Sequence, residues 1–497
     1  MPQPPHMTRD QFRAQAERML DWAERYWDSL DERPVTPAGG PGDLLGVLPD
    51  APPESTPNPD DEWDAIRRDL DRLVVPNLLH WQSPRFFGYF PCNASGPGTL
   101  GVLAGAVLNV NGMLWATSPA ATELETRLLD WCVGAFALPE RFLSTHASGG
   151  TQGGGCIQGT ASESTLIAML AGRDRARRAG HEIGSLRVYT SDQAHSSVVK
   201  GAMIAGLALG PDDRSQVRLI PTDASGAMLT DALRDAVAGD LARGGVPCSV
   251  TATLGTTGTE GVDPLPAIAD AIAELCPDPK PWLHVDGAYT GAALVCPEFG
   301  HLARGLERAD SLCLNPHKWL LTNFDCDLFW TADRAGVTAA LSLTPEYLRN
   351  EATDAGSVID YRDWQIPLGR SFRALKLWFV LRHYGLEGLR AYIRGHVALA
   401  ESLERRLGGD PRFRLVGTRR TALVCFRMET DALTEGLVRA VNARGRVFLS
   451  HTRFADGGHA TEPRYVARVA IGGARTEGAH VDEAMEEIDR AATALLA

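Results

Sequence analysis

Hydrophobic positions near the N-terminus repeat at helical spacing. Thr8 and Gln11 form a predicted capping box, and apolar residues then recur every three or four positions. A second helix is predicted over residues 61–73 and stops before Pro76. Two amphipathic helices therefore open the chain, and each has an apolar face to cover. The face of the first comprises Phe12, Ala16, Met19, Ala23, Trp27 and Leu30.

Prolines separate these two helices. Eight of them lie between Asp31 and Asp60, which excludes regular structure and predicts an extended connector on a surface. Two helices joined in this way make a poor independent domain. We expect them to clamp onto another part of the protein or onto a partner subunit.

Beyond about residue 150 short apolar runs alternate with helical segments. This alternation is typical of a doubly wound α/β domain with a mostly parallel sheet. One helix is predicted to have Asp263 as its N-cap and Pro264 at its first position, and another capped helix begins at 122–125. The predicted strands are Leu186–Thr190, Val217–Ile220, Cys248–Leu254, Trp282–Val285, Ser311–Leu314 and Leu328–Trp330.

A long helix near residues 373–383 is predicted to lead into a C-terminal part that mixes helices and strands, with strands over 421–426 and 465–471. No internal repeat is visible. We expect three regions: an N-terminal helical segment over 1–95, a large α/β domain over 96–375 and a small α+β domain over 376–497.

Composition excludes several classes of protein. The 497 residues carry a net charge of −13 with both signs mixed, which argues against nucleic acid or an anionic membrane as a partner. The nine cysteines form no C-x-x-C pair, so reduced core thiols are expected and a metal site is not. The N-terminus lacks a signal-peptide core, and the longest apolar stretch, 100–110, is too short to span a bilayer. We expect a cytoplasmic protein.

Two polar segments follow buried strands and carry the candidate chemistry. They are 284–289 (HVDGAY) and 315–319 (NPHKW). Because parallel strands end at one edge of a sheet, Asp286 and Lys318 should lie close together. A lysine can form an imine and an aspartate can keep a pyridine nitrogen protonated, which is what pyridoxal phosphate requires from a protein.

A glycine-rich run, 149–159 (GGTQGGGCIQG), precedes a predicted helix and could cradle a phosphate at the helix N-terminus. Its spacing fits neither the dinucleotide fingerprint nor a Walker loop. Taken singly, His195 could be a helix cap or a core histidine, Asp286 a cap and Ser162 a helix-terminal hydroxyl. Their joint occurrence at one predicted sheet edge favours a cofactor site.

Residues 80–90 (HWQSPRFFGYF) place five aromatic side chains and a histidine within eleven positions. Such a run is equally consistent with a hydrophobic core and with the wall of a pocket for a flat substrate.

Several motifs together resemble one family. HWQSPRFFGYFP, SPAATELE, SDQAHSS, ATLGTTGT, HVDGAY, NPHKWLLTNFDCD and DYRDWQIPLGRSFRALKLW are similar to segments of the aromatic-L-amino-acid decarboxylases, members of the group II pyridoxal-phosphate-dependent decarboxylases. The resemblance runs from about Met7 to Val481. It implies an α/β fold of the fold-type I pyridoxal-phosphate transferase kind and a homodimer with shared active sites. It also implies removal of CO₂ from an aromatic amino acid, which leaves the arylalkylamine.

The resemblance also implies roles for individual residues. Lys318 would bind pyridoxal 5′-phosphate, Asp286 would pair with its ring nitrogen, and His195 would stack on the ring and help to place the substrate carboxylate. Tyr347, on a loop over 343–356, would return a proton to the substrate. The other cofactor-binding residues would be Ala161, Ser162, Thr257, Ala288, Asn315 and His317.

For the substrate pocket the resemblance implies an aromatic wall, two residues from the partner subunit (Asn111 and Met113) and Gly369 at the far end. Gly369 leaves room for an indole, and Cys92 replaces a threonine that meets a catechol hydroxyl in some relatives. We therefore expect tryptophan, phenylalanine or tyrosine, in that order, rather than dopa. The wall comprises Trp81, Tyr89, Phe90, Pro91 and Cys92.

Three alternatives remain at this point. Oxidative aldehyde synthases resemble the family but carry Phe at the position of Tyr347 or Asn at that of His195, whereas this chain has Tyr and His. An aminotransferase would need an arginine for the α-carboxylate, for which Arg468 or Arg475 are candidates. A non-catalytic binding protein would be expected to have lost Lys318, Asp286 or Tyr347.

Overall fold

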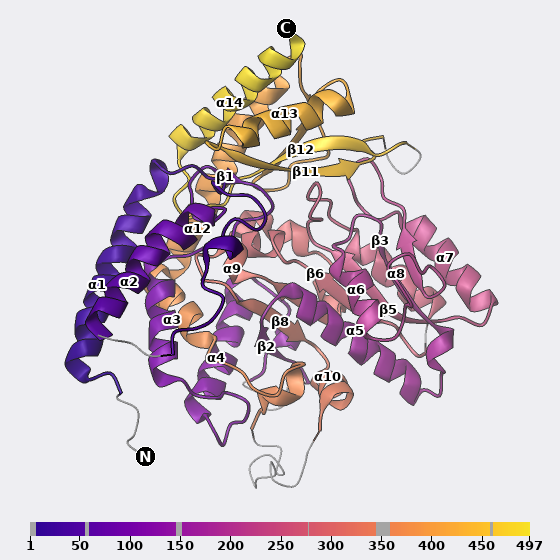
Figure 1. The fold of residues 1–497 in the computed structure, drawn as a ribbon. Coiled ribbons are helices and arrows are strands. Elements are labelled where there is room, and N and C mark those ends of the chain that lie inside the picture. The colour runs from indigo at the N-terminus through magenta and orange to yellow at the C-terminus, as the bar shows by residue number, and fades with distance from the viewer. Residues whose placement is uncertain (1–5, 55–58, 146–151, 277, 344–357, 458–460) are drawn as a thin grey trace.

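Two β-sheets organise the chain. The computed structural model describes residues 6–54, 59–145, 152–276, 278–343, 358–457 and 461–497. A seven-stranded sheet forms the middle of the molecule, and a five-stranded sheet with its helices lies at one end (Figure 1). The N-terminal helices run along one side, beside the α3 helix.

The seven-stranded sheet has the order β2-β8-β7-β6-β5-β3-β4. β8 is antiparallel to both of its neighbours, and the pairs from β7 to β4 are parallel, so the expected mostly parallel α/β sheet is confirmed. Four of its strands, β2, β6, β7 and β8, are buried at every position and β5 at all but its first residue, which explains their continuous apolar runs. Its strands are β2 (Gly154–Gln158), β3 (Leu186–Ser191), β4 (Val217–Ile220), β5 (Val246–Thr253), β6 (Trp282–Asp286), β7 (Ser311–Leu314) and β8 (Asp327–Thr331).

Helices cover both faces of this sheet. α5 contacts β5, β6, β7 and β8 and packs against α6 and α10, whereas α7 and α8 pack together against the opposite face. These helices alternate with the strands along the chain, as a doubly wound fold requires. Their bounds are α4 (Pro119–Ala135), α5 (Ala161–Arg178), α6 (Ser197–Ile204), α7 (Thr230–Ala242), α8 (Leu265–Leu275) and α10 (Arg334–Leu341).

The predicted glycine cradle is wrong in its main part. Gly154 and Gly155 lie in β2, paired antiparallel with β8, and are not a loop before the helix. A Cβ on Gly155 would lie 2.8 Å from the Trp330 side chain, so its glycine permits close packing of two strands. Only the segment from Thr160 onward remains at the helix N-terminus, since α5 begins at Ala161.

Two predicted helix starts are also corrected. α8 begins at Leu265 with Pro264 as its N-cap residue, while Asp263 is buried and accepts hydrogen bonds from the main-chain nitrogens of Thr253 (2.7 Å) and Met228 (2.8 Å). α4 starts at Pro119, ahead of the predicted position, which places Glu125 inside the helix on a buried face. In both cases tertiary partners, rather than local capping, use the acidic side chain.

The five-stranded sheet has the order β1-β11-β12-β10-β9. β1 comes from the aromatic run near the N-terminus and pairs in parallel with β11, which joins distant parts of the sequence. The helices α13 (Asp431–Ala443) and α14 (Gly478–Leu496) pack together and α13 covers β11 and β12. The strands are β1 (Phe86–Phe87), β9 (Arg414–Leu415), β10 (Leu423–Arg427), β11 (Phe448–Phe454) and β12 (Arg464–Ala470).

The remaining helices connect these parts. α1 (Arg9–Asp28) has the predicted Thr8 capping box, and α2 (Pro59–Asp69) packs beside it, with Arg67 Nη1 donating to Gln15 Oε1 at 2.6 Å. α12 (Ala374–Gly408) is longer than predicted and breaks at Gly385, whose φ is 61°. α3 (Gly96–Leu108) packs along α12.

Candidate active site

Four chain segments meet at the carboxyl edge of the seven-stranded sheet. β6 ends in Asp286, β7 is followed by Asn315 and the short helix α9 (Pro316–Trp319), β3 is followed by His195, and β5 by Thr257. The edge is where parallel α/β sheets place their ligands. The segments line an inner cavity of about 210 Å³ made by Phe90, Thr160, Ala161, Ser162, His195, Thr253, Gly255, Thr257, Asp286, Ala288, Tyr289, Asn315, His317, Lys318 and Phe324.

Lys318 lies at the centre of this cavity wall. Its side chain is partly buried, and its Nζ lies 5.5 Å from the centroid of the Phe90 ring. Burial lowers the pKa of Lys318, while the Asp286 charge opposes that shift. The lowered pKa increases the fraction of neutral amine, the form that attacks a carbonyl carbon.

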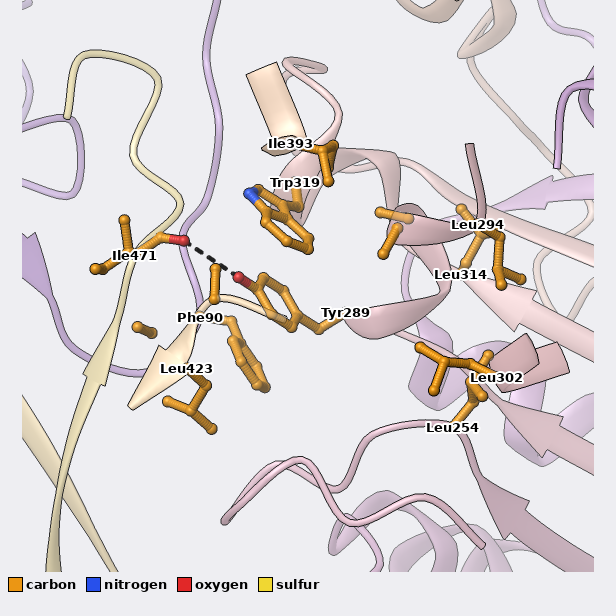
Figure 2. Packing of buried hydrophobic residues seen from close by; sticks show 14 of the residues in the cluster. Phe90, Leu254, Tyr289, Leu294, Leu302, Leu314, Trp319, Ile393, Leu423 and Ile471 are labelled. Atoms are coloured by element: carbon orange, nitrogen blue, oxygen red, sulfur yellow. Dashed lines mark hydrogen bonds between the residues drawn. The ribbon is translucent and has the colours of Figure 1, made fainter. Parts of the chain in front are cut away.

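Stacked aromatic rings fix the backbone that carries Lys318. Trp319 stacks on Tyr289 at 4.7 Å between centroids, and Tyr289 stacks on Phe90 at 3.9 Å. Figure 2 shows these three rings in one column, with the Tyr289 hydroxyl donating to the Ile471 carbonyl oxygen at 3.3 Å. Trp319 Nε1 also donates to His396 Nδ1 at 3.0 Å. Lys318 is therefore next to a rigid, fully packed residue.

Asp286 lies at the end of β6 and is 5% exposed. Its Oδ1 accepts from the Ala288 main-chain nitrogen at 3.0 Å, and the Cys313 thiol is 3.9 Å away. These contacts leave Oδ2 with no hydrogen-bond donor among the described residues. A carboxylate held in this way can stabilise a protonated ring nitrogen placed in the cavity.

His195 is orientated by the first turn of α6. Its Nδ1 accepts from the Ser197 main-chain nitrogen at 3.2 Å and lies 2.9 Å from the Ser197 hydroxyl. The surrounding protein lowers the pKa of His195 by removing water from it, so the ring is neutral near pH 7. Because Nδ1 is an acceptor, the proton of the neutral ring sits on Nε2.

Polar groups near α5 and α9 fit the phosphate and ring substituents of the expected cofactor. Thr160 is the N-cap residue of α5, and Ala161 and Ser162 begin its first turn, where main-chain N–H groups have no helical partner. Asn315 Oδ1 is buried and has no hydrogen-bond partner in the described part of the chain. His317 is neutral, because burial lowers its pKa to about 3, and its Nδ1 accepts from the Cys326 nitrogen at 3.0 Å.

A wider pocket of about 500 Å³ opens from this cavity. Residues 80–90 were predicted to be either hydrophobic core or a pocket wall, and the structure shows both. Phe86 and Phe87 are buried in the core, whereas Trp81 and Tyr89 are 37% and 52% exposed and line the pocket. The pocket is lined by Trp81, Gln82, Tyr89, Phe90, Pro91, Cys92, His195, Thr257, His317, Lys318 and Phe324.

Arg468, on β12, is buried behind this wall and does not offer its guanidinium to the pocket. Nε donates to the Gly258 carbonyl at 2.9 Å, Nη1 to Ser450 Oγ at 2.7 Å and Nη2 to the Tyr89 carbonyl at 3.3 Å. Arg475 stacks over Trp27, 4.9 Å from its ring centroid. Arg468 therefore has no free guanidinium edge for the substrate carboxylate of an aminotransferase, and Arg475 lines neither cavity.

The structure separates three predicted pocket residues from Lys318. Asn111, Met113 and Gly369 do not line either cavity of this chain. Asn111 and Gly369 are exposed on its surface and lie together, because Asn111 Oδ1 accepts from the Arg370 nitrogen at 3.1 Å. Tyr347 lies outside the described residues.

Other residues of the site were not predicted from the sequence. Gln82 and Phe324 line the outer pocket, and Thr160, Thr253 and Gly255 line the inner one. Gln82 and Phe324 belong to motifs quoted above, so their proximity to Trp81 and Lys318 in sequence was the available signal. Asp327 was also missed: it is buried at the start of β8, where its carboxylate accepts from the Ser164 hydroxyl.

None of the described helices is long and apolar enough to cross a membrane. No group of three or more His, Cys, Asp or Glu side chains in the described ranges is arranged to hold a metal ion.

Comparison with known proteins places the chain in a family. Residues 41–429 match the pyridoxal-dependent decarboxylase conserved domain. Tryptophan decarboxylase 2 from Oryza sativa subsp. japonica is 42% identical over 99% of this chain and 96% of its own length. Phenylacetaldehyde synthase from Arabidopsis thaliana is 41% identical, with 99% and 97% covered.

A solved structure agrees over the whole length. The crystal structure of Oryza sativa TDC with PLP and tryptamine superimposes with a TM-score of 0.92 at 36% identity, and each chain is covered completely (100%). The Lys318–Asp286 edge of the sheet and the family match support one conclusion. The chain belongs to the pyridoxal-dependent decarboxylases, carboxy-lyases that use pyridoxal 5′-phosphate.

Proposed function

We propose that this protein decarboxylates an aromatic L-amino acid to the arylalkylamine and CO₂, with tryptophan preferred over phenylalanine and tyrosine. The observation that carries the proposal is the position of the Lys318 amine. It lies in the wall of a cofactor-sized cavity beside Asp286, and that cavity opens into a pocket walled by Trp81, Tyr89 and Phe90. Its relatives act on flat aromatic amino acids, for which such a wall is suited.

Each polar group of the cavity has a part in holding the cofactor. Lys318 would bind its aldehyde carbon covalently, and Asp286 would hold a proton on its ring nitrogen. The N-terminal end of α5, from Thr160 to Ser162, and the side chains of Asn315 and His317 would bind its phosphate and surroundings, with Thr257 and Ala288 beside the ring. When bound, pyridoxal phosphate supplies an electron sink for the bond between Cα and the carboxylate.

The chain's own side chains then control the substrate. With the cofactor bound, Lys318 would be the residue whose place the substrate amine takes, and its lowered pKa favours the neutral amine. His195, with its proton on Nε2, would help to orient the substrate carboxylate. Tyr347 is proposed as the residue that returns a proton to Cα.

Decarboxylation is favoured over the oxidative aldehyde synthase reaction. This chain keeps both His195 and Tyr347, the two positions at which such synthases differ. Because an aldehyde synthase is among the relatives, the product must be measured rather than assumed. The hydrogen-bonded guanidinium of Arg468 and the position of Arg475 outside both cavities argue against an aminotransferase, and the retained Lys318 and Asp286 argue against a non-catalytic binding protein.

We also propose a homodimer whose partner subunit completes each active site. Exposed apolar residues lie on α1 and α3, among them Phe12 (55%), Leu103 (48%) and Val107 (68%). Apolar faces of this kind are typical of subunit interfaces. Asn111, Met113 and Gly369 would reach the partner's pocket from the surface they share.

The proposed compartment is the cytoplasm, which is supported by nine cysteines that are all free thiols. The proposed domain boundaries remain 1–95, 96–375 and 376–497. The position of β1 in the five-stranded sheet supports a close association of the first region with the last.

The test is a panel of aromatic amino acids supplied to the purified protein with pyridoxal phosphate. CO₂, amine, ammonia and hydrogen peroxide are measured together. We expect equal amounts of CO₂ and amine without peroxide. Equimolar peroxide would establish the aldehyde synthase reaction instead, and a keto acid without CO₂ would establish transamination. Lys318→Ala should abolish turnover and the visible absorbance of the bound cofactor.

A further inference from the structure

Gln82 is a polar residue in the aromatic wall that the proposed reaction does not use. It is half-buried and lines the outer pocket next to Trp81. Its Nε2 donates to the Cys92 carbonyl oxygen at 2.6 Å. Both ends of this contact are pocket residues, so the amide plane of Gln82 is fixed at the pocket wall.

The contact determines which end of the amide is free. A main-chain carbonyl can only accept, so the nitrogen of the Gln82 amide must face Cys92 and the oxygen must not. Within the described part of the chain, no donor hydrogen-bonds to Gln82 Oε1. Gln82 Oε1 is therefore an orientated hydrogen-bond acceptor in the pocket wall, available to a donor on a bound molecule.

The other polar groups of the pocket have different tasks or different chemistry. Lys318, His317, His195 and Thr257 also line the inner cavity and belong to the cofactor end. The thiol of Cys92 stays protonated, because burial raises its pKa to about 11, and a thiol is a weak acceptor. The remaining lining is largely aromatic: Trp81 offers only a donor, and the hydroxyl of Tyr89, which can donate or accept, belongs to a side chain that is 52% exposed.

We propose that Gln82 Oε1 accepts a hydrogen bond from a donor on the substrate ring, the indole N–H of tryptophan or the phenol O–H of tyrosine. This makes Gln82 a specificity-determining residue, and the inference rests on the proposed function. A phenylalanine ring has no donor, so it would leave the amide oxygen without a partner in the closed site. Sites that bond a ring donor discriminate strongly against analogues that lack it.

The first experiment changes the substrate and leaves the protein intact. The wild-type holoenzyme is assayed with tryptophan, 1-methyltryptophan, phenylalanine and tyrosine. We expect kcat/KM for 1-methyltryptophan to be about tenfold or more below that for tryptophan, mainly through KM, because the contact lies away from the reacting bond. Equal kcat/KM for tryptophan and 1-methyltryptophan would overturn the proposal.

The second experiment changes the residue. Gln82→Leu and Gln82→Met should lower kcat/KM for tryptophan and tyrosine about tenfold and leave that for phenylalanine within about twofold. An equal loss for tryptophan and phenylalanine would show a structural role only, and no loss would show no contact. Gln216→Leu is the matched control, because its Nε2 also donates to a main-chain carbonyl, Ile183 at 2.7 Å, and it lines neither cavity.

The inference and the proposed function can fail separately. If no amine forms from any substrate, the proposed function fails. Binding of tryptamine and phenethylamine to the holoenzyme, followed by protein fluorescence, then still tests Gln82. We expect Gln82→Leu to weaken tryptamine binding about tenfold and to leave phenethylamine binding unchanged. Equal weakening of both would overturn the inference.

Discussion

Arg468 lies against the ring of Phe90, with the guanidinium carbon 5.2 Å from the ring centroid. Lys318 Nζ lies 5.5 Å from the same centroid, so Arg468 and the proposed catalytic lysine both contact one aromatic ring. Arg468 also joins three segments that are far apart in sequence, through Tyr89, Gly258 and Ser450. One residue of the five-stranded sheet therefore fixes the substrate wall and the loop that carries Thr257.

This arrangement makes Arg468 a positioning residue. Arg468→Met should raise KM about tenfold for every aromatic substrate, because the Tyr89–Phe90 wall loses its anchor. Arg468→Lys should also have a raised KM, because an ammonium group cannot reproduce the three directed hydrogen bonds of a planar guanidinium group. Steady-state kinetics check this. Arg427→Met, which removes a buried arginine of the neighbouring strand β10 bonded to Asp456, should leave KM unchanged.

Replacing either of two buried acids near Lys318 by asparagine should affect kcat to very different extents. Asp286→Asn should lower kcat by about 10²–10³, because an amide cannot stabilise a charged ring nitrogen. Asp327→Asn should change kcat less than about threefold, because Asp327 lines neither cavity and bonds the Ser164 hydroxyl, and burial raises its pKa towards the neutral form that an amide resembles. The measurements are kcat and the absorbance of the bound cofactor. Similar losses in the two variants would contradict the assigned role of Asp286.

A buried ion pair supports the surface that is proposed to reach the partner's site. Arg370 bonds both oxygens of Glu125, at 2.8 and 2.9 Å, and each side chain is 2% exposed. Glu125→Gln should lower the free energy of unfolding by about 3–5 kcal/mol, because it leaves a buried guanidinium charge unpaired. Urea unfolding measures this. Glu298→Gln is the control: it breaks an exposed ion pair with Arg394 and should lower the free energy of unfolding by less than about 1 kcal/mol.

Three buried histidines make stability depend on pH. Burial lowers the pKa of His284 and His396 to about 4 and that of His317 to about 3. In the unfolded chain a histidine titrates near 6.5, so acid protonates the unfolded state first. The stabilisation is complete above pH 6.5 and is lost as the pH falls towards 4.

Each of these histidines should lower the free energy of unfolding at pH 5 by about 2 kcal/mol relative to its value at pH 7.5. Urea unfolding at the two pH values tests the prediction. His396→Gln should reduce the difference, whereas His301→Gln, at an exposed position, should not. An unfolding free energy that stays constant between pH 7.5 and 5 would show that these histidines are not held neutral.

The sequence by itself determined the local elements and the proximity of the two candidate catalytic residues. The Thr8 capping box, the buried runs of β6 and β7, and the polar residues that end them depend on near neighbours in the chain, so spacing alone predicted them. Asp286 and Lys318 could be placed together because adjacent parallel strands end at one edge.

Tertiary structure decided the rest. Asp263 bonds main-chain nitrogens of other segments instead of capping a helix, and the glycines at 154 and 155 serve strand packing. Arg468 hydrogen-bonds residues as distant in sequence as Tyr89 and Ser450. No local sequence pattern predicts which distant carbonyl oxygen will accept a hydrogen bond from a buried guanidinium group. Side-chain hydrogen bonds between remote segments are chosen by how the two sheets pack, because buried polar groups take whichever partners that packing provides.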